Sequence, residues 1–150
     1  QSPQCMKSKK SYWFEVSVRL QRMADDGSNR SVTELYAVDA ISFTEAEKRI
    51  QKELSGEIRS GMEVKNINPA PYKEVFFTDD ESGEHWYKAK LSFITLDETT
   101  GKEKRSNTTY LVQADTFAEA LRNVESFMDG NSDYVTANIC ETKIIDVYQR

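Results

Sequence analysis

The chain has 150 residues and a formal net charge of -5, which suits a soluble protein and excludes a general attraction to nucleic acid or anionic lipid. No apolar run approaches the ~20 residues of a membrane-spanning helix, so no membrane association is expected. Two cysteines, Cys5 and Cys140, are too few for a disulfide framework, and we expect a cytoplasmic protein in which Cys140 is a buried thiol.

The first eleven residues are polar and carry lysines, but they lack the apolar core of a signal peptide. Met6 looks like a natural start, and we interpret residues 1–11 as a disordered tail outside the fold. Residues 12–150 are then expected to form a single domain, because halves of about 70 residues sit near the lower limit for folding alone.

The first predicted element is an alternating segment over residues 13–20. Its apolar side chains recur at every second position, which is typical of a half-buried strand. A polar stretch with a glycine, residues 25–29, predicts a hairpin turn that leads into a second strand over residues 32–40.

The period then changes to that of a helix. Ser42-x-x-Glu45 is a capping box, in which hydroxyl and carboxylate satisfy free amides at a helix start. An apolar stripe follows, and Gly56 is expected to end the helix. Two prolines then break the last strand of this half into pieces over residues 64–68 and 72–77.

The same order of elements recurs in the second half of the chain, at an offset of 72 to 74 positions. An alternating segment begins at Trp86, a glycine turn covers residues 98–102, and a second strand runs over residues 108–114. A second capping box, Thr116-x-x-Glu119, opens a helix whose stripe starts at Phe117, and a last strand is expected from about residue 134 to 148. Matched pairs include Trp13 with Trp86, Tyr36-x-Val38-x-Ala40 with Tyr110-x-Val112-x-Ala114, and Phe43-x-Glu45-Ala46 with Phe117-x-Glu119-Ala120.

These patterns predict an α+β fold of two tandem β-β-α-β repeats packed as one pseudo-symmetric domain, with a mainly antiparallel sheet and two helices. Repeat one spans residues 12–78 and repeat two spans residues 85–150. The crossover rule places the third strand of each repeat parallel to its second strand, with the first strand between or beside them. We expect the Phe117 ring in the core, where its truncation to alanine is expected to cost about 3 to 5 kcal/mol.

Catalytic chemistry has little support in these residues. His85 is the one histidine, and its acidic neighbours Asp79, Asp80, Glu81 and Glu84 belong to a short connector whose composition is typical of a solvated turn. No nucleophile motif, phosphate loop or metal-ligand spacing is present. We therefore predict a protein that is not an enzyme and uses no metal or cofactor; an enzyme built on His85 and the connector acids is a third hypothesis.

The strand residues that face away from the predicted core offer a candidate binding surface. Exposed aromatic rings beside cations on a sheet hold single-stranded nucleic acid by stacking and phosphate attraction. The alternative is that both tryptophans pack between the repeats or against the opposing third strands, since large exposed aromatics are uncommon without a partner. The candidate residues are Trp13, Arg19, Trp86, Lys88 and Lys90.

The doubled pattern Tyr-x-Val-x-Ala-x-Ser/Thr-Phe-x-Glu-Ala, with its aromatic opening strand, resembles a family of roughly this length from gut bacteria and their phages, a domain of unknown function. The resemblance covers the chain from Tyr12 onward and implies no catalytic or binding residue. We expect a non-catalytic accessory or interaction module of a bacterium or phage, with a protein partner. A single-stranded nucleic-acid binder is the alternative, and exposed edge strands also suggest a dimer.

Overall fold

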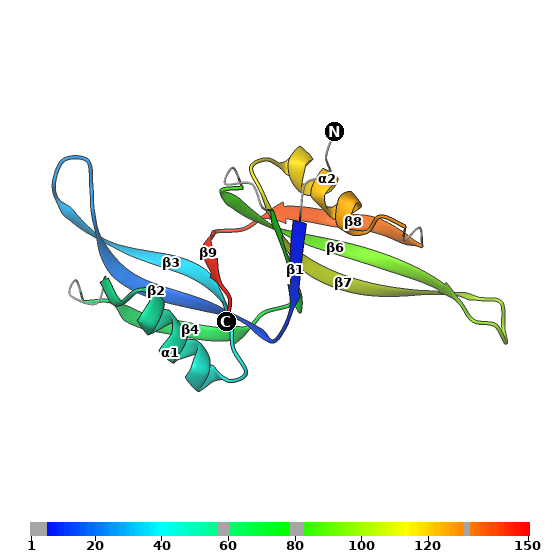
Figure 1. Cartoon of the computed structure of the whole chain (residues 1–150), viewed down its shortest axis with the longest axis horizontal. Helices are drawn as coiled ribbons and strands as arrows, with labels where there is room; N and C mark the ends of the chain where they lie inside the picture. The colour runs from blue at the N-terminus through cyan, green and yellow to red at the C-terminus, as the bar shows by residue number, and fades with distance from the viewer. Residues whose placement is uncertain (1–5, 57–60, 79–82, 131–132) are drawn as a thin grey trace. The chain divides into compact units, whose positions relative to one another are not determined.

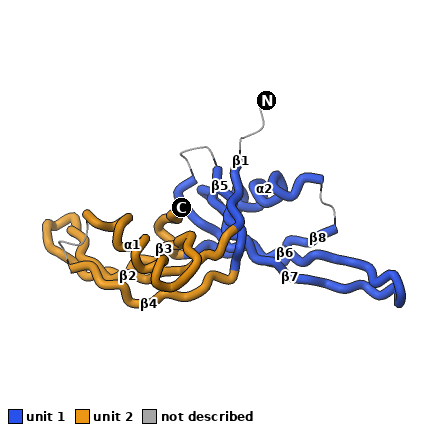
Figure 2. Tube along the Cα trace, turned by 60° about the horizontal axis from the view of Figure 1, so that its bottom comes forward, with its two compact units in different colours: residues 1–10, 72–142 blue, residues 11–71, 143–150 orange. Residues whose placement is uncertain are grey.

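The computed structural model describes residues 6–56, 61–78, 83–130 and 133–150 (Figure 1). The chain divides into two compact units (Figure 2). Unit 1 is made of Gln1–Lys10 and Tyr72–Thr142, and unit 2 of Ser11–Pro71 and Lys143–Arg150. Each unit has its own sheet and its own helix, which confirms the predicted α+β fold. The single domain over residues 12–150 stays a prediction.

Unit 2 is built on a four-stranded sheet in the order β4-β2-β3-β9. β2 and β3 form an antiparallel hairpin whose turn contains Gly27 at a φ of 84°, so the predicted glycine turn is confirmed. β4 pairs antiparallel with β2, and β9 pairs parallel with β3. The strand bounds are β2 Trp13–Met23, β3 Asn29–Asp39, β4 Glu63–Pro69 and β9 Ile144–Tyr148.

Helix α1, Phe43–Glu53, begins at the predicted capping box, where the Ser42 hydroxyl accepts a hydrogen bond from the Glu45 amide at 3.1 Å. Its buried stripe packs on one face of the sheet, and the resulting core consists of Phe14, Val16, Val18, Leu20, Tyr36, Val38, Ala40, Ala46, Ile50 and Leu54. The predicted stop at Gly56 is wrong in detail, because Leu54 is the C-cap and Gly56 does not adopt a positive φ.

Unit 1 is built on a five-stranded sheet in the order β1-β5-β7-β6-β8. The segment Met6–Lys10 forms strand β1, paired antiparallel with β5, so the prediction that residues 1–11 lie outside the fold is wrong for these five residues. Residues 1–5, including Cys5, lie outside the described residues. The other strands are β5 Glu74–Thr78, β6 His85–Leu96, β7 Glu103–Ala114 and β8 Tyr134–Glu141.

Helix α2, Phe117–Phe127, begins at the second capping box, where the Thr116 hydroxyl accepts from the Glu119 amide at 3.1 Å. Val124 packs on the sheet with Phe76, Leu91 and Val112. The Phe117 ring is 56% exposed, which contradicts its predicted place in the core: it is the first residue of the helix, where solvent reaches the stripe. Neither described helix has the length and apolar character needed to span a membrane.

The predicted direction of the strand after each helix is confirmed: β4 runs parallel to β3 and β8 runs parallel to β7, with the first strand of the half between them. β4 and β8 pair antiparallel with the first strand of their own half, β2 and β6. The strands that pair directly and in parallel with β7 and β3 come from the other half of the sequence: β5 pairs with β7, and β9 pairs with β3. The last strand, predicted over residues 134–148, is two strands separated by Thr142 and Lys143. The first of them, β8, belongs to unit 1, and the second, β9, belongs to unit 2.

This pairing follows from the chain after each helix. β3 and β4, and likewise β7 and β8, are parallel strands of one sheet joined through a helix, so the crossover rule applies to both connections. The exchange of β5 and β9 gives the two sheets the same internal order, β5-β7-β6-β8 and β9-β3-β2-β4, with β1 added at one edge of unit 1. The duplication itself remains an inference from the sequence.

Candidate functional site

Both tryptophans are buried. Trp13 is 2% exposed and Trp86 is 4% exposed. The Trp86 ring meets Phe77 edge to face at 5.7 Å, and its carbonyl accepts hydrogen bonds from the amide and hydroxyl of Thr142. A ring without an exposed face cannot stack on a base, so the hypothesis of exposed tryptophans is wrong; burial of both rings agrees with the alternative.

The three predicted cations fall in different units. Arg19 lies on β2 in unit 2, where its Nε donates to the Ser31 hydroxyl at 2.8 Å and Glu63 stands directly opposite on β4. Lys88 and Lys90 lie on β6 in unit 1. The predicted five-residue site is therefore not one cluster within either unit.

Unit 1 instead carries a larger basic surface on the sheet face opposite α2, which we name the basic face. Strand register places on it every second residue of β6, β7 and β1, because directly paired residues share a side. Among the strand residues described on this face, one is acidic: Glu103, next to the β6–β7 turn. The basic residues of this face are Lys7, Lys9, Lys88, Lys90 and Arg105.

Part of the basic face is open to solvent. Lys90 and Arg105 are exposed, and within the described residues neither takes part in an ion pair. Lys90 stands in one cross-strand row between Thr109 on β7 and Asn138 on β8, and Asn107 is exposed in the next row. This part of the face combines two cations with hydrogen-bonding amides.

Lys88 and Cys140 stand opposite each other on the basic face, two residues along the strands from Lys90 and Asn138. Lys88 is half-buried, and its Nζ lies 5.9 Å from the centre of the Tyr72 ring. Cys140 is exposed rather than buried, since the β8 register sets it opposite Lys88 and away from the core; its thiol donates to Asn138 Oδ1 at 2.9 Å. The predicted buried thiol is wrong.

His85 lies on the other face of the sheet. Its Nδ1 is 3.3 Å from Glu141 Oε2, and both side chains are about half exposed. Asp79, Asp80 and Glu81 lie outside the described residues, and the Glu84 amide donates to Asp115. Among the described residues, no three His, Cys, Asp or Glu side chains are grouped to hold a metal ion.

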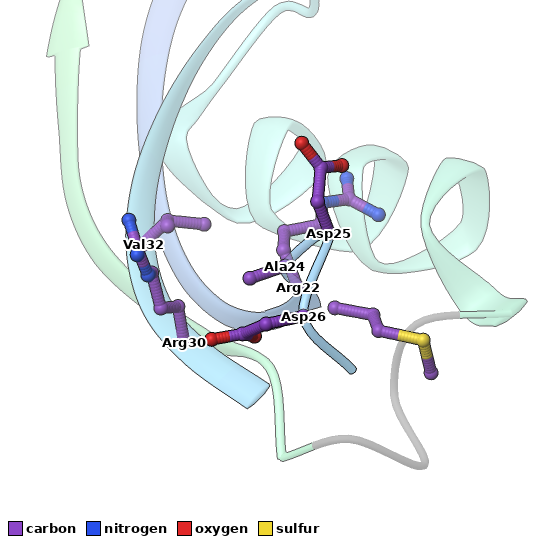
Figure 3. Close-up of a pocket in the computed structure, with 7 residues that line it drawn as sticks. Arg22, Ala24, Asp25, Asp26, Arg30 and Val32 are labelled. Atoms are coloured by element: carbon purple, nitrogen blue, oxygen red, sulfur yellow. The ribbon is translucent and has the colours of Figure 1, made fainter. Parts of the chain in front are cut away.

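A pocket of about 400 Å³ opens at the tip of the β2–β3 hairpin in unit 2 (Figure 3). Its charges are balanced, because two arginines and two aspartates line it, and Asp26 already accepts two hydrogen bonds from Ser28. The lining residues are Arg22, Met23, Ala24, Asp25, Asp26, Arg30 and Val32. Such a site has no preference for a charged ligand.

Next to this pocket lies a polar network. Arg22 pairs with Glu34 at 2.8 Å, and the Tyr36 hydroxyl donates to the same carboxylate at 2.8 Å. The Arg22 hydrogen bond lowers the pKa of Glu34, whereas burial, with the Glu34 contact, raises the pKa of Tyr36. Tyr148 stacks on Tyr36 at 5.5 Å, and burial raises its pKa to about 12. The network fixes β9 side chains against β3 and is structural.

Sequence reasoning misses three of the five basic residues of the basic face. Lys7 and Lys9 were assigned to a tail, and Arg105 and Asn107 precede the predicted start of the second strand at residue 108. The available signal was limited: lysine recurs at every second position in 7–9, whereas residues 103–107 are all polar and show no alternation. Edge strands rich in lysine are typical of sheets that avoid further pairing.

The comparisons with known proteins concern the family alone. The family model described as Domain of unknown function (DUF4494) matches residues 12–150. No curated protein and no solved structure matches the chain.

Proposed function

Because the chain belongs to this family of unknown function, we propose, from its own surfaces, a non-catalytic binding module that holds a polyanion on the basic face of unit 1. The observation that carries the proposal is charge segregation: five cations and Glu103 are the charged strand residues described on this face. The cytoplasmic location and the bacterial or phage origin belong to the same proposal.

The arrangement of candidate catalytic groups supports a binding role over an enzyme. His85 is engaged by Glu141 on an exposed strand, and Cys140 hydrogen-bonds Asn138 with no histidine beside it. Neither pair provides the nucleophile, base and third orienting group that covalent catalysis requires in one place.

Electrostatics favour a ligand with many negative charges. The net charge of the chain is -5, so attraction must come from a local field rather than from the whole molecule. Exposed Lys90 and Arg105 supply this field, and within the described residues neither forms an ion pair. A single small anion gains little from such spaced cations, whereas a polyanion contacts several at once.

The test is titration with inorganic polyphosphate of defined length at low and high salt. Replacing Lys90 and Arg105 by glutamine is expected to weaken binding roughly tenfold to thirtyfold at low salt, on a scale of about 1 kcal/mol for each basic side chain near an anionic surface. Lys104→Gln is the matched control, since Lys104 neighbours Arg105 but pairs with Thr95 on the opposite face.

A second readout uses the exposed thiol. With Cys5 replaced by serine, Cys140 is the single cysteine, and bound polyphosphate is expected to slow its alkylation. Equal weakening by Lys104→Gln, or no binding by the wild-type chain at low salt, contradicts the proposal.

A further inference from the structure

We infer that the polyanion is single-stranded nucleic acid, an inference that rests on the proposed function. Along the strands of the open part, cations and an amide follow one another: the cross-strand row of Lys90 comes first, the row of Asn107 second and the row of Arg105 third. Arg105 lies four residues from Thr109, the partner of Lys90, so the two cations are about 13 Å apart along the sheet. Hydrogen-bonding side chains lie between them.

The chemistry of the intervening side chains favours bases over a simple polyphosphate. Asn107 and Asn138 are exposed amides, each able to donate and accept, and such amides match the edges of nucleobases. Cys140 already donates to Asn138 Oδ1, which leaves the amide NH₂ of Asn138 directed to other acceptors. A ligand with phosphates alone can accept from the amide NH₂ groups but offers no donor to the amide oxygens, whereas base edges offer both.

The width of the surface favours a single strand over a duplex. Lys90, Thr109 and Asn138 lie on three adjacent strands, whose outer members are about 10 Å apart before side chains are added. A three-stranded face with its side chains is wider than the major groove of B-DNA, which is about 12 Å wide and admits a helix or a two-stranded ribbon. Bases must therefore be unpaired to reach these amides.

Burial of both tryptophans gives the complex a definite signature. With Trp86 4% exposed, phosphate attraction and hydrogen bonds replace stacking on this face. Affinity is then expected to depend strongly on salt, and the salt slope is expected to fall by about 0.7 for each phosphate of a single strand that a variant no longer neutralises. Tryptophan fluorescence is expected to resist acrylamide and to stay unchanged when an oligonucleotide binds.

The experiment compares a single-stranded oligonucleotide, its duplex and a polyphosphate of equal charge, by anisotropy or calorimetry, on the whole chain. The single strand is expected to bind most tightly. Asn107→Ala and Asn138→Ala are each expected to weaken its binding about fivefold, the size of one hydrogen bond, and to weaken polyphosphate binding less. Asn66→Ala, at the aligned position on β4 in unit 2, is the matched control.

The outcomes separate the two proposals. Equal binding of oligonucleotide and polyphosphate, unaffected by the asparagine variants, overturns the inference and leaves polyanion binding intact. Tighter binding of the duplex overturns it in favour of double-stranded nucleic acid. Failure of all three ligands to bind at low salt overturns both the inference and the proposed function.

Discussion

The two units place different chemistry at the same point of the same strand order. Asp39 ends β3 opposite Trp13, and Gln113 stands on β7 opposite Trp86. Asp39 is buried and accepts hydrogen bonds from the Ser11 hydroxyl and the Arg150 amide. Gln113 accepts from the Thr78 amide at 3.0 Å and donates to the Gly83 carbonyl at 2.6 Å.

In both units this side chain ties the segment entering the hairpin to the segment leaving the parallel strand. A carboxylate only accepts, so unit 2 supplies two donors, whereas an amide also donates, so unit 1 offers a carbonyl. The fit around Gln113 is close: a Cβ at Gly83 would lie 2.7 Å from Gln113 Cγ. The same structural task is met by two hydrogen-bond patterns, each requiring its own neighbours.

The solvent-facing strand positions differ in charge as well. Lys88 and Lys90 in unit 1 occupy the positions aligned with Glu15 and Ser17 in unit 2. In unit 2, Arg19 faces Glu63 across the strands. Among the described strand residues, the shared order of strands therefore carries a basic face in unit 1 and not in unit 2, which is why we propose binding by unit 1.

The largest expected effects come from the cores. Ile50→Ala in unit 2 and Leu91→Ala in unit 1 are each expected to lower the free energy of unfolding by about 2 to 5 kcal/mol, because both side chains are fully buried. Phe117→Ala is the control and is expected to cost less than about 1 kcal/mol, since more than half of the ring is exposed.

Denaturant unfolding of these variants also sharpens the comparison of the units. One transition that shifts with either core variant indicates a single cooperative domain, as the sequence predicts. Two transitions, each moved by one variant, indicate units that unfold separately. A large loss from Phe117→Ala contradicts our placement of the core.

Local patterns in the sequence predicted much of the fold. Both capping boxes, both glycine turns and the alternating strands depend on neighbours within a few residues. The exchange of β5 and β9 is not local: each has the apolar alternation of a strand, and nothing in it specifies which hairpin it joins. The candidate site could be predicted only in part for the same reason. Strand register decides on which side of the sheet Cys140 and Arg105 lie, and register is set by pairing with distant residues.

A smaller effect is expected at the position that distinguishes the units. Gln113→Glu keeps the acceptor for Thr78 but loses the donor to Gly83, so we expect a loss of about 1 to 3 kcal/mol near neutral pH. The loss is expected to shrink in acid, where a protonated carboxyl can donate. Gln21→Glu, at an exposed position on β2, is the control, and equal stability of both variants contradicts the assigned hydrogen bonds.

The smallest effect is expected in alkali. Burial raises the pKa of Tyr148 from its ordinary value of 10.0 to about 12, so the protonated phenol is favoured in the folded state. Stability from this group is fully present below pH 10 and is lost as the pH rises toward 12. Tyr148→Phe is expected to flatten this alkaline decline in thermal stability, whereas Tyr12→Phe, at an exposed ring, is expected to leave it unchanged.

The most direct test of the strand exchange is to divide the chain into fragments 1–78 and 83–150. Each fragment holds strands of the other fragment's sheet: fragment 1–78 carries β5, which pairs with β7, and β1 beside it, and fragment 83–150 carries β9, which pairs with β3. Amide NMR spectra are expected to show neither fragment natively folded alone, and an equimolar mixture is expected to reproduce the spectrum of the whole chain as a one-to-one complex. Two fragments that each fold as monomers and do not associate would contradict the exchange.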